Sequence, residues 1–230
     1  PLWIAKDILH ATGGQCNRID WSISGIAIDN RAVSKGDLFI AIVGPNNDGH
    51  NYVAAALEAG AVAALVSHIP EGLEHSDTLV LVEDTQKAME SLGQAARDRV
   101  EAKIIAVTGS VGKTGTKEAL ALCLSALGKT HYSVGSFNNH WGVPLSLARM
   151  PADTEFAIFE LGMNHAGELG PLSRMVRPDV AIITIIAAAH LEFFDSTDDI
   201  ARAKAEIFEG VRKGGTVLLN RDDSHYPLLE

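Results

Sequence analysis

The stretch Ile104-Ile-Ala-Val-Thr-Gly-Ser-Val-Gly-Lys-Thr-Gly-Thr-Lys-Glu-Ala-Leu120 decides the fold of this chain. It joins an apolar run, Ile104–Val107, to a glycine-rich turn and then to a helix-forming segment, Lys117–Leu127. A strand, turn and helix in this order form a cradle for phosphate groups, because backbone N–H groups and the positive end of the helix face the anion. The stretch therefore predicts that the chain binds a nucleoside triphosphate.

The turn itself supplies two side chains with expected roles. Lys113 can reach the outer phosphates, and the hydroxyl of Thr114 can ligate Mg²⁺. The common pattern G-x-x-x-x-G-K-[ST] has glycine where this chain has Val107, so a glycine-rich turn without a ligand is the plainer alternative. The flanking strand and helix favour the phosphate loop. Its expected nucleotide-binding residues are Gly109, Ser110, Val111, Gly112, Lys113, Thr114 and Gly115.

The composition describes an acidic globular protein. Of 230 residues, 47% are hydrophobic and 21% are charged, and the formal net charge is −10. This balance argues against nucleic acid or an anionic membrane as the main partner, because both attract a basic surface. No apolar run approaches the roughly 18 residues that cross a bilayer, so we expect no membrane insertion. Cys16 and Cys123 lack metal-type spacing and predict reduced thiols in a cytoplasmic protein.

Two regions with different patterns predict two α/β domains. Residues 1–100 contain short apolar strands and helices, whereas residues 101–230 alternate strand and helix. Continuous apolar strands that alternate with helices indicate a parallel sheet covered on both faces, with ligands at the carboxyl ends of its strands. We therefore expect a small N-terminal α/β domain followed by a P-loop parallel-sheet domain.

The boundaries of the expected elements follow from apolar runs, glycines and capping patterns. Ser196, three residues before Asp199, predicts a capping box at the start of the last helix. The expected strands are 23–28, 38–43, 61–66, 79–82, 104–107, 130–134, 156–161, 180–186 and 216–219. The expected helices are 52–59, 85–100, 117–127, 144–149, 168–175 and 198–209.

Three further residues are candidates for catalysis or metal binding. Glu160 ends an apolar strand, where a carboxylate can reach an ion held by Thr114, although a helix cap is the alternative. His190 follows an apolar stretch, where a histidine is more often packed or exposed than a ligand. Lys204 shares the apolar stripe of its helix, and a long stem that covers apolar surface with the ammonium in water explains this position.

Polar segments in both regions are candidates for substrate binding. The loop Ser136–Gly142 is rich in hydrogen-bonding side chains, although its two asparagines also favour turns. Arg31 follows a strand and Gly49 precedes a helix, and together they can hold an anionic group such as a diphosphate. Turn chemistry alone explains most of these residues. The candidate substrate-binding residues are Asp29, Asn30, Arg31, His50, Asn138, Asn139 and His140.

Together these segments resemble the Mur ligases, a family of ATP-dependent enzymes that form amide bonds in peptidoglycan precursors. The resemblance covers essentially the whole chain and explains the missing first glycine of the phosphate loop. It is greatest to the members that add D-alanyl-D-alanine to UDP-N-acetylmuramoyl-tripeptide. The stretches that carry it are Asp29-Asn-Arg-Ala-Val-Ser-Lys-Gly-Asp-Leu-Phe-Ile-Ala41, Asp48-Gly-His-Asn-Tyr-Val53, Asn138-Asn-His-Trp-Gly-Val-Pro-Leu-Ser146, Glu160-Leu-Gly-Met-Asn164 and Ala189-His-Leu-Glu192.

The resemblance implies ATP and Mg²⁺ as cofactors and assigns roles around them. Glu160 and His190 match the family's metal-coordinating residues, and Thr114 completes the expected metal set. Lys204 falls where several members carry a carbamylated lysine, which here is a hypothesis only. Lys113, His190 and Lys204 are thus the expected catalytic residues.

The resemblance also implies two substrate regions. Asp29–Arg31 and His50 match the pocket for the uridine diphosphate, and Asn138–His140 would face the nucleotide-peptide and the γ-phosphate. Two departures stand out: Asn30 replaces a serine or threonine, and Ile186–Ala189 is more apolar than in the family pattern.

Members of this family have three domains and roughly twice this length. We therefore expect a fragment that is inactive alone, with a UDP-binding domain at 1–100, part of an ATP-binding domain at 101–230, and no C-terminal domain. We expect a monomer. The third residue of the tripeptide stays open.

Three other interpretations remain. A folylpolyglutamate-synthase-like ligase shares the ATP-binding core, but it would begin close to the phosphate loop. A guanine-specific switch would show Asn-Lys-x-Asp or Asp-x-x-Gly, and the sequence has neither. A module that binds the UDP-linked peptide without catalysis would show no ATP hydrolysis that depends on this peptide.

Overall fold

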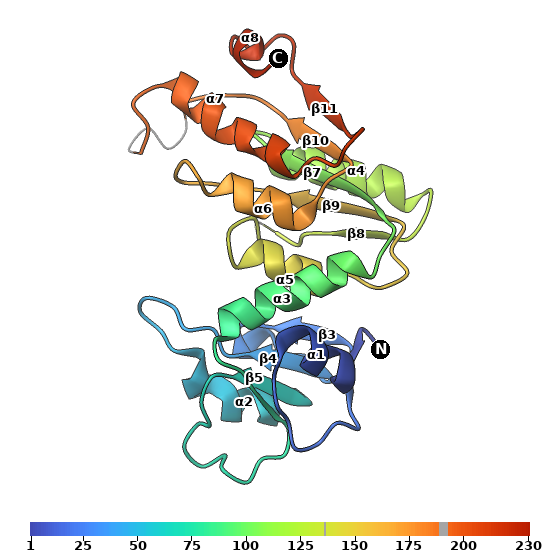
Figure 1. Cartoon of the computed structure of the whole chain (residues 1–230), viewed down its shortest axis with the longest axis vertical. Helices are drawn as coiled ribbons and strands as arrows, with labels where there is room; N and C mark the ends of the chain where they lie inside the picture. The colour runs from blue at the N-terminus through green and yellow to red at the C-terminus, as the bar shows by residue number, and fades with distance from the viewer. Residues whose placement is uncertain (136, 189–192) are drawn as a thin grey trace. The chain divides into compact units, whose positions relative to one another are not determined.

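The computed structural model describes residues 1–135, 137–188 and 193–230. The chain divides into two compact units, Pro1–Ala96 and Arg97–Glu230. Each is an α/β unit built on a parallel sheet (Figure 1), which confirms the predicted fold class. The assignment of residues 1–100 to substrate binding and 101–230 to ATP binding stays a prediction.

The first unit is built on a four-stranded parallel sheet of order β3-β4-β5-β6, beside a two-stranded antiparallel ribbon of β1 and β2. Side chains alternate across a strand, so Ala64 and Val66 of β5 share one face and pack with Val53 and Ala56 of α2. The elements are β1 (Trp3–Ile4), α1 (Ala5–Thr12), β2 (Ser22–Ile23), β3 (Gly25–Ala27), η1 (Asn30–Ala32), β4 (Asp37–Ile40), η2 (Gly49–Tyr52), α2 (Val53–Glu58), β5 (Ala63–Val66), β6 (Leu79–Leu81) and α3 (Thr85–Asp98), where η marks a 3-10 helix.

The second unit is built on a five-stranded parallel sheet of order β11-β10-β7-β9-β8. The strand β9 lies between β7 and β8, so β7 and β8 are consecutive in the sequence but not neighbours in the sheet. The elements are β7 (Lys103–Thr108), α4 (Lys113–Ser125), β8 (Thr130–Tyr132), α5 (Gly142–Ala148), β9 (Phe156–Glu160), α6 (Leu169–Val176), β10 (Val180–Ile183), α7 (Thr197–Ala205), η3 (Glu206–Gly210), β11 (Thr216–Leu219) and α8 (Tyr226–Leu229).

Helices cover both faces of this second sheet. On one face Val107 and Ile158 pack with Ala121 of α4. On the other face Ile104 and Phe159 belong to a larger core that includes residues of α5, α6 and α7. Because β7 is buried on both faces, its apolar run is continuous rather than alternating, as parallel strands require.

Several boundaries differ from the sequence predictions, and three of these differences are informative. The expected strand 23–28 is split between β2 and β3, because the backbone N–H of Ser24 donates to Gly36 O instead of continuing a ladder. The helix expected from Lys117 already begins at Lys113, so the Lys-Thr pair forms its first turn. The strand expected to reach 186 ends at Ile183. At the last helix the predicted cap is confirmed, since the Ser196 side chain accepts from Asp199 N.

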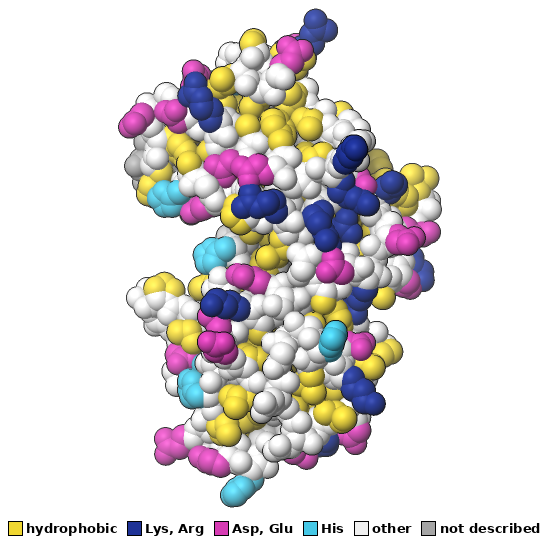
Figure 2. Space-filling view, viewed as in Figure 1, with side chains coloured by type: hydrophobic (Ala, Val, Ile, Leu, Met, Phe, Trp, Pro, Cys, Tyr) yellow, Lys and Arg dark blue, Asp and Glu magenta, His cyan; other side chains and the backbone are white. Residues whose placement is uncertain are grey.

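Acidic and basic side chains lie next to one another on the face shown in Figure 2. The second unit contains several ion pairs, including Arg177 with Asp98 and Arg212 with Asp179. Both cysteines are free, as predicted, and Cys123 is exposed on α4. Within the described residues, no helix has the length and apolarity needed to cross a membrane.

Candidate functional site

The turn between β7 and α4 has the backbone of a phosphate loop. Gly112 caps α4 with φ of 88°, in the left-handed region that glycine adopts without strain. In the described part of the chain, the N–H groups of Gly112, Lys113 and Thr114 have no hydrogen-bond acceptor. Free N–H groups at the start of a 13-residue helix, combined with its dipole, attract an anion.

The loop is fixed by the segment that follows β10. The N–H of Ser110 donates to Ile185 O at 2.8 Å, and the hydroxyl of Thr184 donates to Val111 O at 2.6 Å. The Ser110 hydroxyl also donates to Ala187 O at 3.0 Å. This explains why β10 ends early: its continuation hydrogen-bonds the loop rather than a strand.

Gly109 has no room for a side chain in this arrangement. Its φ is 145°, and a Cβ atom there would lie 1.9 Å from the Thr184 hydroxyl oxygen. Gly115 is the opposite case, because it lies inside α4 and a Cβ atom would meet nothing within 4 Å. The loop conformation thus requires glycine at position 109 but not at position 115.

The predicted polar residues of this region meet around one carboxylate. Glu160 is 1% exposed at the end of β9. Its Oε2 accepts from the Thr114 hydroxyl at 2.9 Å, and its Oε1 accepts from Asn138 Nδ2 at 2.8 Å. Lys113 lies over the loop and donates to Gly109 O at 2.9 Å. Residues far apart in the sequence are therefore in direct contact at the carboxyl edge of the sheet.

This donor set fits a Mg²⁺ ion. Mg²⁺ takes oxygen ligands and is held by one or two protein groups together with phosphates and water. Thr114 and Glu160 offer a hydroxyl and a carboxylate at hydrogen-bond distance from each other, directly beside the free N–H groups of the loop. Glu160 is paired only with neutral donors among the described contacts, so its negative charge is available to a cation.

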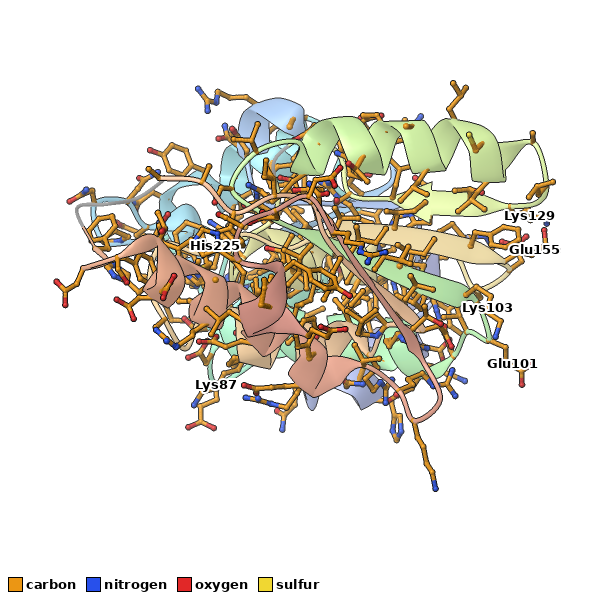
Figure 3. The ribbon with its side chains drawn as sticks, turned by 90° about the horizontal axis from the view of Figure 1, so that it is seen from above. Lys87, Glu101, Lys103, Lys129, Glu155 and His225 are labelled. Atoms are coloured by element: carbon orange, nitrogen blue, oxygen red, sulfur yellow. The ribbon has the colours of Figure 1, made fainter. Side chains whose placement is uncertain are left out.

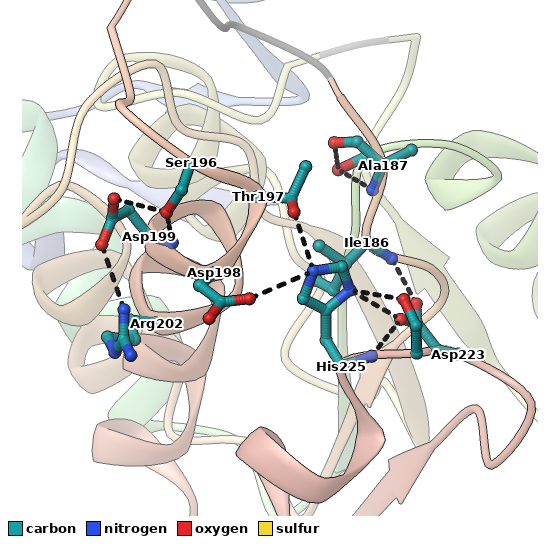
Figure 4. Close-up of polar contacts among 11 residues, drawn as sticks. Ile186, Ala187, Ser196, Thr197, Asp198, Asp199, Arg202, Asp223 and His225 are labelled. Carbon is teal, nitrogen blue, oxygen red and sulfur yellow. Dashed lines mark hydrogen bonds and ion pairs between the residues drawn. The ribbon is translucent and has the colours of Figure 1, made fainter.

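A second carboxylate, Asp223, supports the segment after β10 (Figure 4). Its Oδ2 accepts from Ile186 N at 2.6 Å, and its Oδ1 lies 3.0 Å from His225 Nδ1. The other ring nitrogen of His225 lies 3.0 Å from the Thr197 hydroxyl at the start of α7. Burial is the largest single influence on the pKa of Asp223 and raises it. The hydrogen bonds from Ile186 and His225 together outweigh burial, so the pKa is lowered overall. The carboxylate thus holds the strand extension that in turn holds the loop.

Figure 3 shows which end of the second unit this is. Lys103, Lys129 and Glu155 mark the amino ends of β7, β8 and β9, and His225 lies at the opposite end. The carboxyl edge therefore carries both the loop and the support from Asp223, as expected for ligand sites in parallel sheets.

The other predicted residues of this unit have varied surroundings. The Asn139 side-chain oxygen accepts from Gly142 N at 2.8 Å and so closes the turn before α5. His140 is exposed and lies against Trp141, with ring centroids 5.2 Å apart. His190 lies outside the described residues.

Lys204 is 2% exposed, so the expected ammonium in water is not observed. Burial, and to a lesser extent the positive charge of Lys113, lowers the pKa of Lys204 to about 8. The charge of Lys113 thus acts on Lys204, which the sequence spacing did not show. At neutral pH a larger fraction of this amine is uncharged than for an exposed lysine.

In the first unit, the predicted diphosphate residues Asp29 and Arg31 bind each other. Arg31 Nη2 donates to Asp29 Oδ2 at 2.7 Å and Nε to Oδ1 at 3.0 Å, while Asn30 begins η1. Hydrogen bonds from Arg31 lower the pKa of Asp29 to about 2. The Arg31 side chain is 84% exposed, so its remaining donors face solvent.

His50 is buried, and both of its ring nitrogens are used. Nε2 lies 2.9 Å from Ser67 N, which must donate, so Nδ1 carries the proton and donates to Asp48 at 2.6 Å. The ring face stacks on His68 at 4.0 Å, beside a pocket of about 260 Å³. Asp48, His50 and His68 could suggest a metal site, but His50 has no free lone pair in this arrangement. The polar residues that follow β3, β4 and β5 do share the carboxyl edge of this sheet.

Sequence reasoning missed the residues that support the site. Lys117 is fully buried, and Ser133 is 1% exposed at the end of β8. The position of Lys117, three residues after Thr114 on an otherwise apolar helix face, was the available signal. Asp223 follows the last strand in a run of turn-forming residues, and nothing in that run indicated its contact with Ile186.

Comparisons with known proteins agree with this geometry. A model described as the Mur ligase middle domain matches residues 107–230, and one described as Mur ligase family, catalytic domain matches residues 22–103. The chain is 41% identical over 225 residues to UDP-N-acetylmuramoyl-tripeptide--D-alanyl-D-alanine ligase of Rickettsia prowazekii, covering 98% of this chain and 49% of that protein. The chain thus spans about half the length of the curated relatives it matches.

Solved structures give the same result. MurF from Acinetobacter baumannii matches with a TM-score of 0.86 and 35% identity, over 99% of this chain and 50% of that one. The MurF ligase of Thermotoga maritima in complex with ADP matches with a TM-score of 0.72 and 29% identity, over 89% and 47%. These similarities extend over both units.

The contrast between the two glycines gives a first prediction. We expect Gly109→Ala to disrupt the loop and to weaken nucleotide binding by at least ~10-fold, because its Cβ meets Thr184 at a positive φ. We expect the matched control Gly115→Ala to keep binding and to raise the free energy of unfolding by about 0.5–1 kcal/mol, because alanine favours a helix. Titration with Mg-nucleotide and denaturant unfolding measure both, and equal binding by the two variants would contradict the loop geometry.

Lys204 gives a second prediction, on pH. Its pKa of about 8 lies below that of an unfolded lysine, so the unfolded state binds more protons between pH 8 and 10.5 and stability rises with pH there. We expect Lys204→Met to remove this dependence, so that its free energy of unfolding relative to the unmodified protein falls by about 2 kcal/mol from pH 7 to 9.5. Urea unfolding in CO₂-free buffer measures it. Lys213→Met, at an exposed lysine, should keep the original slope, and an unchanged slope for Lys204→Met would contradict burial as the cause.

Proposed function

The chain belongs to the Mur ligase family, and from this premise we propose that the complete protein joins D-alanyl-D-alanine to UDP-N-acetylmuramoyl-tripeptide at the expense of ATP. The observation that carries the proposal is the contact of Thr114 with Glu160 beside the free N–H groups of the phosphate loop. The relatives of matching sequence have this ligase name, and one solved neighbour is in complex with ADP.

Charge is the main obstacle to the first step. The terminal carboxylate of the tripeptide attacks the γ-phosphate of ATP, and both groups are anions. Lys113 and the loop N–H groups stabilise the charge that builds up on the phosphate oxygens. Lys113 would exchange its bond to Gly109 O for one to phosphate, because that carbonyl is its partner without ligand. The products of this step are an acyl phosphate and ADP.

Thr114 and Glu160 would hold Mg²⁺, which supplies further positive charge to the phosphates when bound. Asn138 fixes the second oxygen of Glu160, so the carboxylate keeps one orientation. The amine of D-alanyl-D-alanine then attacks the acyl carbon, forms the amide bond and releases phosphate. Water must be excluded at this stage, because it would hydrolyse the acyl phosphate.

Lys204 is proposed to be carbamylated. The uncharged amine attacks CO₂, a C–N bond forms, and one proton leaves to give a carbamate anion. The lowered pKa of Lys204 favours this step, because only the uncharged amine reacts. The product would replace a buried cation with an anion, which attracts the positive charge of Lys113 instead of repelling it. His190 is proposed as a further metal ligand.

The first unit is proposed to bind the uridine diphosphate of the substrate. Arg31 has exposed donors for an anion, and the polar residues after β3, β4 and β5 share one sheet edge. Asn139 and His140 are proposed to contact the nucleotide-peptide. In this proposal the protein works in the cytoplasm as a monomer, on substrates linked to a nucleotide.

The test is ligation by the complete protein and its Lys113→Ala variant. We expect the variant to lose on the order of 10²–10³-fold in kcat/KM for ATP-dependent product formation, because it loses a charged donor to the transferred phosphate. Isothermal titration should show that it still binds UDP-N-acetylmuramoyl-tripeptide, since that site lies on other residues.

Lys129→Ala is the matched control, because Lys129 is exposed at the opposite edge of the sheet. It should keep full activity. If the unmodified protein forms no product, the proposed function is wrong. If Lys113→Ala loses ligation and binding of the UDP-linked peptide equally, the proposed division of roles is wrong.

A further inference from the structure

A lysine that the proposed reaction does not use lies inside the second unit. Lys117 is 0% exposed and belongs to the second turn of α4, three residues after Thr114. Burial of an ammonium group is costly unless its donors are satisfied, and an apolar side chain fills such a position at lower cost. The presence of lysine here therefore requires an explanation.

The ammonium group of Lys117 has two hydrogen-bond acceptors and one ion-pair partner. Nζ donates to Ser133 O at 2.7 Å and to Gly135 O at 2.9 Å, and it lies 3.1 Å from Glu118 Oε1. An ammonium group has three donors and no acceptor. Because Lys117 is fully buried and two of its donors bind backbone carbonyls, we infer that any effect on the reaction acts through the backbone that it holds.

That backbone leads directly to Glu160. The Ser133 N–H donates to Ile158 O at 3.1 Å, and the Ser133 hydroxyl accepts from Glu160 N at 3.2 Å. The Thr114 hydroxyl donates to Glu160 Oε2. The contacts therefore form a closed circuit, from Lys117 to Ser133, to Glu160, to Thr114 and back along α4, which we call the Lys117 circuit.

The second carbonyl extends the effect to Asn138. Gly135 lies three residues before Asn138, which donates to Glu160 Oε1. The Asn138 carbonyl accepts from Gly162 N at 2.8 Å, and a Cβ atom on Gly162 would lie 2.8 Å from the Asn138 side chain. Lys117 thus anchors Gly135, three residues before the side chain that orients the carboxylate.

We propose that Lys117 is a positioning residue for the metal-nucleotide site: it fixes Ser133 and Gly135 so that Glu160 and Asn138 keep their places relative to the phosphate loop. The inference rests on the proposed function, because that function assigns Mg²⁺ to Thr114 and Glu160. Groups that orient metal ligands alter metal affinity by roughly 10–100-fold when they are replaced.

The experiment measures Mg²⁺-dependent binding of ADP to the complete protein, followed by ligation kinetics. In Lys117→Met we expect the Mg²⁺ concentration for half-maximal binding to rise about 10-fold, with a similar fall in kcat. The KM for the UDP-linked peptide should change less than the Mg²⁺ requirement, because its uridine diphosphate is proposed to bind the first unit. Lys117→Arg should recover part of the Mg²⁺ response, since it retains charged donors.

Lys129→Met is the matched control, with the same substitution at an exposed lysine, and it should leave the Mg²⁺ response unchanged. Ser133→Ala removes the bond to Glu160 N while the Ser133 carbonyl stays, so it tests the circuit even if Lys117→Met does not fold. We expect about a 3-fold rise in the Mg²⁺ requirement for Ser133→Ala, which is below the usual 10–100-fold range because the Ser133 carbonyl still binds Lys117.

The outcomes separate the two proposals. If the unmodified protein binds no nucleotide with Mg²⁺, the proposed function fails, and this inference fails with it. If it does bind, but a folded Lys117→Met or Ser133→Ala responds to Mg²⁺ as the unmodified protein does, only the inference is overturned. A loss of thermal stability alone, with an unchanged Mg²⁺ response, would likewise show Lys117 to be merely structural.

Discussion

The hydrogen bond from Thr114 to Glu160 joins the start of α4 to the end of β9, and the candidate site depends on it. It exists because parallel strands end at one edge of a sheet, which puts the turn and helix start that follow β7 within reach of the last residue of β9. The sheet makes this contact without a long loop. The carboxylate is also the common acceptor for Asn138, so a third segment is ordered by the same group. The fold thus concentrates the site at residues whose backbones are fixed by strands and a helix.

The sequence allowed much of this arrangement to be predicted. The phosphate loop, the parallel sheet and the meeting of Glu160 with Thr114 follow from apolar runs, glycines and the position of a carboxylate at a strand end. What could not be predicted is the direction of buried polar side chains. The apolar stripe of α7 indicated a solvated ammonium for Lys204, and the residue is buried. Lys117 gave no signal beyond its spacing, because its partners are carbonyl groups that any residue could supply.

The sequence also did not show where strands end and which backbone groups bind side chains. The strand β10 ends at Ile183 because Thr184, Ile185 and Ala187 turn their polar groups to the phosphate loop. An apolar run does not reveal which of its residues leaves the ladder. His50 shows the same limit: a histidine before a helix suggested ligand binding, and its two nitrogens instead join Asp48 to Ser67. A role of His50 in substrate binding stays a prediction, which is supported by the pocket that His50 lines.

The position of β9 between β7 and β8 has a consequence for folding. Among the described residues, β8 pairs with β9 alone, so Ser133 after its end cannot reach its place until residues 156–160 have entered the sheet. Residues far apart in the sequence must come together, at a cost in loop entropy, before β8 can form its hydrogen bonds. A nascent chain that has emerged only as far as α4 would therefore contain the complete glycine-rich turn, yet it would lack the carboxylate partner of Thr114. We therefore expect this edge to assemble late in folding, so that binding of Mg-nucleotide reports on a finished sheet rather than on a formed loop.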